Sequence, residues 1–459
     1  MQPRATVIAL CIASAAAFNL PPPPAGSTEG RAQSNRAAAH RVGGRRVDLG
    51  YRRPPRALEH PIHGFGAIEP TLGFTEEGSL FYTAMRSNTK LDVVRSSDGG
   101  ETWNDVSPEL APGVRAHTIG LDPYLYVDPQ TSRVFTIDLT VACSYVSFSD
   151  DEGASWTTNP LGCGRPVNDH QTLFAGPPVT SPTVGYPNVV YYCFNDVITS
   201  SCTKSLDGGI TFAPTGTPAY VYPDDDPSQS CGGIHGHGVV DSKGKMYLPR
   251  QFCGWPYLAI SDDEGRTWRR VRVARSRMDS PGSDPSVAVD KQGNIYYAWI
   301  AGKDRLPYLS VSRDGGRSWT SPAMIAAPGV TEANLVTIDV GDPGSVAFAY
   351  AASTDSSFGC ERRDACAGRI DGPPRWHAYM GRTWNALSRR PLLFSATVND
   401  LSDPIVIGGC GPGRCGPLVD FIDVEISPAG DAWGSFVDGV EGRRTNLSRA
   451  FVGSLVRGR

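Results

Sequence analysis

Short runs of alternating apolar and polar residues, separated by turn-forming residues, make up most of this chain. In residues 284–326 such runs occupy 286–289, 295–299, 308–311 and 319–325, with the turn sequence Lys-Gln-Gly between the first two. A period of two is typical of half-buried β-strands, and tight turns join antiparallel neighbours. Because no long helical pattern accompanies these runs, the chain is predicted to be all-β, and this segment to form one four-stranded antiparallel sheet.

An eight-residue turn, Ser-x-Asp-x-Gly-x-Thr/Ser-aromatic, recurs within this unit. Five copies begin 51 to 56 residues apart and occupy 96–103, 149–156, 205–212, 261–268 and 312–319. A strand-rich repeat of about fifty residues is typical of a propeller blade. The Ser and Asp side chains can bond the backbone of a tight hairpin, the Gly can adopt positive φ, and the aromatic residue can pack between sheets. The repeat therefore predicts a β-propeller.

Two degenerate units follow the five clear ones. One covers about 334–390, and the last begins near Asp420 and ends after three strands. Closed propellers commonly complete the last blade with a strand from the other terminus, because this removes exposed edges. We therefore predict seven four-stranded antiparallel blades closed by an N-terminal strand, with 46–51 as the donor. Six blades remain the alternative if either degenerate unit is irregular.

The repeated turn resembles the Asp box, or BNR repeat, of the sialidase superfamily, and the resemblance covers about residues 65–457. It implies a sialidase-like propeller, but the same boxes also occur in non-enzymatic propellers and in xyloglucan-cleaving glycosidases. A sialidase needs an arginine triad, a Tyr nucleophile with its Glu, and an Asp acid/base. Here the first blade opens at 67–70 without arginine, 85–90 lacks an acid, and no tyrosine follows Tyr379. The sialidase catalytic set is therefore expected to be missing.

The N-terminal segment predicts export. Arg4 precedes an apolar run at 5–18, which indicates a signal peptide over 1–19. A Pro-, Ala- and Arg-rich arm, expected to be disordered, follows at 20–44, and 45–459 is expected to be a single propeller domain. No later segment is apolar enough to cross a membrane, and a formal charge of −4 offers no field for nucleic acid. The protein is therefore predicted to be secreted.

Cysteine spacing agrees with an oxidising compartment. Cys11 lies in the signal peptide, and the other ten cysteines fall into five near-neighbour pairs, which favour disulfides within blades over zinc sites because no Cys-x-x-Cys occurs. The expected pairs are Cys143/Cys163, Cys193/Cys202, Cys231/Cys253, Cys360/Cys366 and Cys410/Cys415.

Candidate functional residues begin the innermost strand of each blade, near the central channel. Carboxylates beside imidazoles could perform acid/base chemistry or hold a divalent metal, whereas the alternative is that they cap strands. The candidate catalytic acids or bases are Glu69, Asp122, Asp169 and Asp284. The candidate ligand-binding residues are His170, His235, His237 and Asp420 at these strand starts, together with Arg86 and Arg250, which lie elsewhere and could bind an anion. His235 and His237 share one strand face and are the candidate metal ligands, with a structural pair as the alternative; no other cofactor is expected.

These observations favour a secreted scaffold that binds a glycan or an extracellular protein. The alternative is a sialidase-like exo-glycosidase using carboxylates at the channel mouth. Two such carboxyls about 5–10 Å apart in an open cleft would favour hydrolysis. Scattered or capping carboxyls would favour binding.

Overall fold

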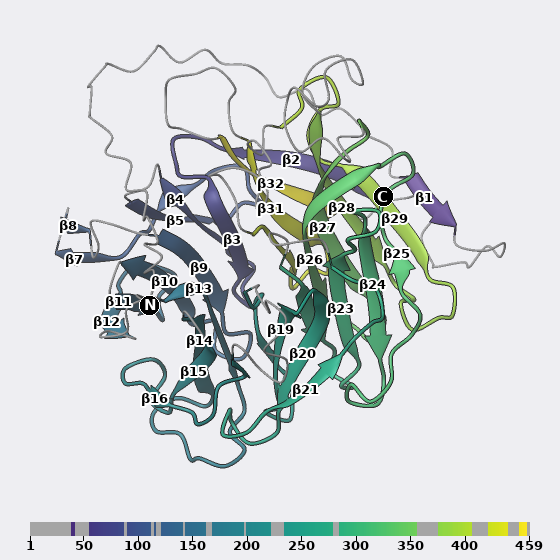
Figure 1. Ribbon diagram of the computed structural model, residues 1–459. Helices are drawn as coiled ribbons and strands as arrows, with labels where there is room; N and C mark the ends of the chain where they lie inside the picture. Colours follow the sequence, from purple (N-terminus) through teal and green to yellow (C-terminus); the bar gives the residue numbers. More distant parts are fainter. Residues whose placement is uncertain are drawn as a thin grey trace, which may run out of the picture. The chain divides into compact units, whose positions relative to one another are not determined.

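The computed structural model describes residues 38–41, 55–86, 90–111, 114–115, 121–140, 143–161, 168–196, 199–221, 234–278, 284–355, 375–405, 421–438 and 449–456. All of them belong to one compact unit, Ser34–Arg459. Its sheets form the seven blades of a β-propeller (Figure 1), as predicted. The described residues contain no helix.

The first four blades follow the chain, each with its inner strand first and its pairing antiparallel. Blade 1 contains β3 (Ile68–Phe74), β4 (Leu80–Arg86), β5 (Lys90–Ser96) and β6 (Asn104–Asp105). Blade 2 contains β9 (Leu121–Val127), β10 (Val134–Thr140), β11 (Cys143–Ser149) and β12 (Thr157–Leu161). Blade 3 contains β13 (Asp169–Gly176), β14 (Val189–Asn195), β15 (Thr199–Ser205), β16 (Ala213–Pro214) and β17 (Tyr220–Val221). Blade 4 contains β18 (Val239–Val240), β19 (Met246–Phe252), β20 (Trp255–Ser261) and β21 (Arg269–Arg272).

The last three blades complete the ring. Blade 5 contains β22 (Ser286–Val289), β23 (Ile295–Ile300), β24 (Pro307–Ser312) and β25 (Ala323–Met324). Blade 6 contains β26 (Glu332–Val340), β27 (Val346–Ser353), β28 (Trp376–Thr383) and β29 (Leu392–Thr397), with β1 (Ala38–Arg41) added at its edge. Blade 7 contains β30 (Asp423–Ile426), β31 (Ala432–Asp438), β32 (Arg449–Val456) and β2 (Arg56–Ile62). A small hairpin, β7 (Glu109–Ala111) and β8 (Val114–Arg115), follows blade 1.

The ring closes between the last blade and the first. Each inner strand contacts the inner strand of the next blade, and β30 of blade 7 contacts β3 of blade 1. The fourth strand of blade 7 is β2, from the N-terminal part of the chain, which confirms closure by an N-terminal strand. The expected donor, 46–51, lies outside the described residues, and Arg56–Ile62 occupies its predicted place. Residues 38–41 of the expected arm form β1; the signal peptide and the rest of the arm lie outside the described part.

All five repeated turns have the predicted hydrogen bonds. In each, the Ser hydroxyl donates to the Asp carboxylate and accepts from the backbone N–H of the second Gly position, as Ser261 does with Asp263 (2.9 Å) and Gly265 (2.8 Å). These five glycines have φ between 78° and 100°. The Asp carboxylate also accepts a hydrogen bond from the hydroxyl of the Thr or Ser four residues later. This bond is the largest cause that lowers the pKa of Asp98 and of Asp314 to about 2. These carboxylates therefore hold hairpins at the end of the blade away from the start of the inner strands.

The core lies between neighbouring sheets and is rich in aromatic residues. The largest fully buried side chains include Trp299, Tyr82 and Tyr191. The predicted Cys193–Cys202 disulfide links two paired strands of blade 3. Cys253 is also disulfide-bonded, although its expected partner Cys231 lies outside the described residues. The other three expected pairs include cysteines that lie outside them too: Cys163, Cys360, Cys366, Cys410 and Cys415. Within the described residues, no helix is long and apolar enough to cross a bilayer.

Candidate functional site

Four inner strands carry the same irregularity near their first residue. In each, an extra residue interrupts the pairing with the second strand, and a residue other than glycine has a positive φ. These residues are Glu69 (φ 54°), Asp122 (φ 44°), His170 (φ 48°) and Leu335 (φ 59°). This conformation costs on the order of 1–3 kcal/mol, and a bulge redirects the side chain it carries. The irregularity therefore marks one equivalent position in four blades.

Hydrogen bonds between blades identify this position in blades 5 and 7. In blade 1 the hydroxyl of Thr71, two residues after Glu69, accepts from a backbone N–H of the next blade at 2.8 Å. Ser286 makes the same kind of bond at 3.1 Å, and the carboxylate of Asp423 does so at 3.3 Å. The residues two positions earlier, Asp284 and Phe421, are therefore equivalent to Glu69.

Blade 4 supplies the remaining member. In blade 1, Glu69 directly follows Ile68, which pairs with Met85 of the second strand. In blade 4, Gly236 directly follows His235, which pairs with Arg250 of the second strand, so Gly236 is equivalent to Glu69. We call the seven equivalent positions the entry ring, which consists of Glu69, Asp122, His170, Gly236, Asp284, Leu335 and Phe421.

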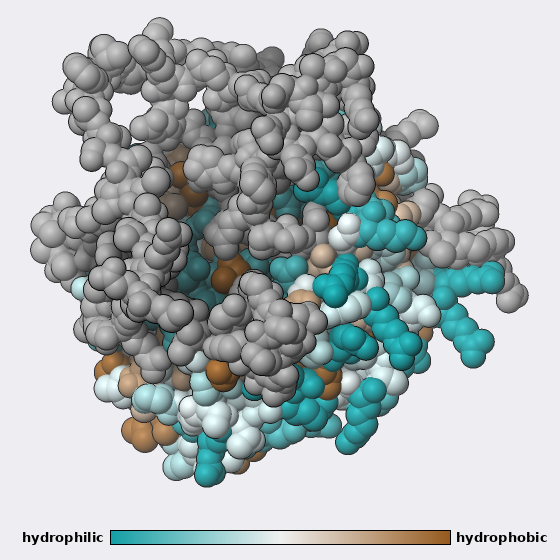
Figure 2. Space-filling view, viewed as in Figure 1, coloured by the Kyte–Doolittle hydropathy of each residue, from teal (hydrophilic) through white to brown (hydrophobic). Residues whose placement is uncertain are grey.

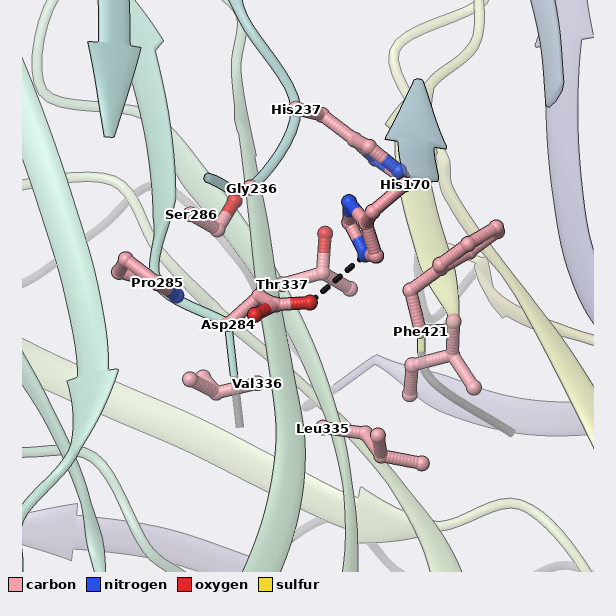
Figure 3. Close-up of a pocket in the computed structure, with 11 residues that line it drawn as sticks. His170, Gly236, His237, Asp284, Pro285, Ser286, Leu335, Val336, Thr337 and Phe421 are labelled. Carbon is pink, nitrogen blue, oxygen red and sulfur yellow. Dashed lines mark ion pairs between the residues drawn. The ribbon is translucent and has the colours of Figure 1, made fainter. Parts of the chain in front are cut away.

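A pocket lies at the entry ring. Five ring residues line it, together with His237 and short stretches around Pro285 and Thr337 (Figure 3). It is small and open to solvent: its cavity volume is about 20 Å³, and the surrounding empty space of about 320 Å³ includes open solvent. The side chains that converge there come from blades 3 to 7, so residues distant in sequence build it.

His170 and Asp284 form the polar centre of the pocket. The Nε2 atom of His170 lies 2.7 Å from Oδ2 of Asp284, and their side chains are 1% and 15% exposed. Figure 3 shows the two side chains pointing toward each other from different blades. Gly236 lies between those blades, and a Cβ at Gly236 would come within 2.1 Å of the Pro285 carbonyl oxygen. The glycine thus allows blade 5 to approach closely enough for the pair to form.

Aromatic rings surround this pair. Phe421 meets His170 at 5.0 Å between ring centroids and His237 at 4.9 Å, both edge to face. The His170 and His237 rings stack at 5.7 Å, and Tyr124 contacts His237 at 4.5 Å. One wall of the pocket is therefore built of aromatic and imidazole rings.

His235 and His237 are held in the neutral form. Burial, and next the adjacent His170, lower the pKa of His237 well below its usual value. The same two causes lower the pKa of His235 to about 3. Nε2 of His237 is buried and has no hydrogen-bond partner among the described residues.

The metal expectation finds no support in the described part of the chain. No group of three His, Cys, Asp or Glu side chains there is arranged to hold a metal ion. Nδ1 of His235 lies 2.9 Å from the carbonyl oxygen of Gly236. This contact occupies one of the two nitrogens that a metal could use.

The other expected carboxylates do not line the pocket. Oδ2 of Asp122 accepts a hydrogen bond from the backbone N–H of His170 at 3.1 Å, so Asp122 caps the neighbouring strand. Glu69 is buried in blade 1, and Asp169 begins β13 opposite Asn195. Asp420 lies outside the described residues. Of the four candidate catalytic carboxylates, Asp284 alone lines this pocket.

The expected arginines have local partners. Arg86 donates to Asp92 at 2.7 Å. Arg250 is buried, donates to the Ser200 hydroxyl at 2.6 Å and lies over the Tyr220 ring. Neither lines the pocket.

Sequence reasoning missed two kinds of residue. Leu335 and Phe421 belong to the entry ring, and the signal that could have located them is Thr337 or Asp423, two positions later. Gly236 was also missed, and it lacks this signal because Gly238 stands two positions after it. Sequence reasoning also missed the acids further along the inner strands of blades 6 and 7. Burial raises the pKa of Asp339 to about 6. Burial, and after it the charge of Asp339, raise the pKa of Asp423 to about 7. For the same reasons, the pKa of Glu425 is raised.

Comparisons with known proteins found one curated relative and a group of solved structures. No protein-family model matches the chain. A curated relative, a xyloglucanase from Paenibacillus sp, is 24% identical over 259 residues, which cover 52% of this chain and 24% of the relative. The chain therefore spans about a quarter of that relative's length.

Solved structures similar to this chain are sialidases, sialidase-like propellers and lectins. A Hadza microbial sialidase is 18% identical with a TM-score of 0.45 and covers 66% of each chain. An Aleuria aurantia lectin in complex with Fucα1-6GlcNAc is 12% identical with a TM-score of 0.45, over 74% of this chain and 97% of the lectin. An intramolecular trans-sialidase from Ruminococcus gnavus is 13% identical with a TM-score of 0.41, over 85% and 95%. The seven-bladed propeller fold itself rests on the strand pairing of this chain.

Proposed function

We propose that this protein binds carbohydrate at the entry-ring pocket. The observation that carries the proposal is the His170–Asp284 pair beside the ring of Phe421. A carboxylate that is partly exposed can accept hydrogen bonds from sugar hydroxyls, while an aromatic ring can pack against the apolar face of a sugar. A pocket with a few convergent polar groups and an aromatic wall suits such a ligand.

Binding explains the carboxylates better than hydrolysis does. A glycosidase of the usual kind needs two carboxyl groups facing each other across the sugar. Among the described residues, Asp284 is the one candidate carboxylate that lines this pocket, and it is already paired with His170. Asp122 is engaged by a backbone N–H. These engagements support a scaffold over an exo-glycosidase.

The proposed setting is extracellular. The Cys193–Cys202 disulfide is compatible with an oxidising compartment, and the curated relative's name, xyloglucanase, also points to carbohydrate. An extracellular protein partner is the alternative, and it would be detected as failure of every glycan to bind.

A glycan array followed by calorimetry with the full chain tests the proposal. We expect a glycan ligand whose affinity falls about tenfold or more in Asp284→Asn and in Phe421→Leu, because each removes one contact of the kind worth about 1.4 kcal/mol or more. Asp342→Asn is the matched control, since Asp342 is an exposed carboxylate paired with Lys291 between β26 and β27.

Equal affinity in Asp284→Asn and in the wild type would overturn the pocket assignment. Fluorogenic glycosides should be screened in parallel. Turnover that Asp284→Asn abolishes would replace binding by hydrolysis.

A further inference from the structure

The outer edge of blade 4 carries a concentration of arginine. Residues 266–277 contain six arginines and no acid, in a chain whose formal charge is −4. Five of the six are exposed, and β21 within this segment is the edge strand of its blade. On the face shown in Figure 2, hydrophilic side chains gather over the area that β21 to β25 occupy in Figure 1. The charge of this edge is therefore local and strongly positive.

Two of these arginines are held in place by one tryptophan. The guanidinium carbon of Arg272 lies 5.0 Å from the centroid of the Trp255 ring, and that of Arg277 lies 4.6 Å from it. Cation–π contacts of this kind contribute about 0.5–1 kcal/mol at exposed sites. Within the described residues neither arginine forms an ion pair with a carboxylate. Two like charges are thus gathered around one ring, and no carboxylate of the described residues is paired with either.

This cluster lies on the same end of blade 4 as the entry ring. Trp255 follows the turn Cys253–Gly254, which joins β19 to β20 just beyond Arg250, the pairing partner of His235. The edge strand β21 runs back toward this end, with Arg272 opposite Tyr257. Arg277 follows the strand and lies against the same turn, because a Cβ on Gly254 would come within 2.9 Å of its Nη1 atom.

A charged edge strand also prevents pairing with other sheets, and this accounts for exposed charges along β21. It does not account for Arg277, which lies beyond the strand and is nevertheless held against Trp255. Guanidinium groups match carboxylate and sulfate groups in a bidentate manner, so arginine rather than lysine suits the recognition of such anions.

We propose that Trp255, Arg272 and Arg277 form a second binding surface, which takes an anionic polysaccharide carrying carboxylate or sulfate groups. The surface contacts its ligand through the free N–H edges of two guanidinium groups, and the neighbouring arginines extend the positive field along the blade edge. A chain of sugars with repeated charges can engage several of the arginines that the edge of blade 4 exposes. This proposal is independent of the entry-ring pocket.

Binding of the full chain to defined polymers tests the surface. The probes are polygalacturonate, which is carboxylated, heparin, which is sulfated, and dextran, which is neutral. We expect at least one anionic polymer to bind, binding to weaken as salt rises, and dextran not to compete for this surface. The double variant Arg272→Gln/Arg277→Gln should weaken binding about tenfold or more, because each charged hydrogen bond contributes about 1.5–3 kcal/mol.

The matched control is Arg389→Gln/Arg390→Gln, which removes two exposed arginines between β28 and β29, at the opposite end of the blades. It should leave binding unchanged, and all variants should keep the thermal unfolding temperature of the wild type. The proposal is overturned if neither anionic polymer binds, or if the control pair weakens binding as much as the test pair. Equal affinity for a DNA duplex or for phosphatidylserine vesicles would also overturn it, since this would show general attraction of polyanions.

Discussion

His170 of blade 3 and Asp284 of blade 5 meet at 2.7 Å across the inner end of blade 4. Their blades are not neighbours in the ring, so the pair spans a blade that contributes only Gly236 at this position. Hydrogen bonds between adjacent blades are repeated around the propeller, whereas this pair joins blades that are not neighbours. It therefore gives the entry ring a distinct polar side.

Loss of the Asp284 carboxylate should destabilise the propeller as well as alter the pocket. Asp284→Ala removes the carboxylate that lies 2.7 Å from the buried Nε2 atom of His170, and the loss of one partner of a buried polar contact costs about 1–3 kcal/mol. Denaturant unfolding measures the change. Asp342→Ala, which removes an exposed carboxylate, should change the free energy of unfolding by less than about 0.5 kcal/mol. Equal effects of the two substitutions would contradict a structural role for the pair.

Gly236→Ala should be one of the most damaging glycine substitutions in the chain. The added methyl group would lie 2.1 Å from the backbone oxygen of Pro285, and backbone cannot move aside as a flexible side chain can. Overpacking of this kind costs about 1–3 kcal/mol or more. Gly341→Ala is the control, because its added methyl group would meet Ile426 at an ordinary 3.5 Å. Unfolding temperatures that fall equally for both variants would refute the close approach at Gly236.

The glutamates of two repeated turns should differ in their contribution to stability. Glu264 is fully buried, accepts from Lys204 at 2.6 Å and from the backbone N–H of Val179 at 2.7 Å, and so ties blade 4 to blade 3. Glu152 makes a comparable contact with Arg95 of blade 1 but is 36% exposed. We expect Glu264→Gln to cost about 3 kcal/mol and Glu152→Gln less than about 1 kcal/mol. Chemical denaturation measures both, and similar costs would show that burial does not set their difference.

The contribution of Glu264 should also depend on pH. Burial alone would raise its pKa, but the hydrogen bonds from Lys204, Thr180 and Val179 outweigh burial and hold the pKa well below its usual value. A carboxylate whose folded pKa is below its unfolded value stabilises the fold above the unfolded value, and this stability is lost as the pH falls. The difference between the wild type and Glu264→Gln should therefore shrink on acidification below pH about 4.5.

The inner carboxylates of blades 6 and 7 should show the opposite trend. The pKa of Asp423 in the folded protein is raised to about 7, chiefly by burial and also by the charge of Asp339. A raised carboxyl pKa contributes stability below the unfolded value, and this contribution is lost as the pH rises toward the folded value. Asp423→Asn removes that charge. Its unfolding temperature, relative to the wild type, should therefore be higher at pH about 7.5 than at pH about 4.

Thermal unfolding across this pH range measures the trend. Asp342→Asn, on the surface, should show none of it. A relative stability of Asp423→Asn that does not change with pH would contradict the raised pKa of Asp423.

Much of the architecture follows from the sequence because its determinants are local. The hydrogen bonds of each repeated turn join residues two to four positions apart, as in Ser261, Asp263 and Gly265, so the turn is recognisable in any copy. The Cys193–Cys202 disulfide likewise joins paired residues of adjacent strands. The spacing of the turns then determines the blade length, and the count of units gives seven blades.

The candidate site could be predicted only in part. The sequence showed that His170, His237 and Asp284 start inner strands, but it could not separate these three from Asp122 or Glu69, which share the same bulged position. Which ring members face a common pocket depends on how the blades are packed. Phe421 was missed because the meaning of Asp423, two positions later, emerges only when the hydrogen bonds between blades are compared.

By itself, then, the sequence determined an all-β propeller of seven units, with its hairpins, one short disulfide and the positions where functional side chains begin. Closure of the ring determined the rest. It selected Arg56–Ile62 as the strand that pairs with Arg449–Val456, and it brought His170 to Asp284 across Gly236. These contacts join residues far apart in the chain, and their energies depend on the approach of whole sheets. No periodicity within a blade can therefore encode them.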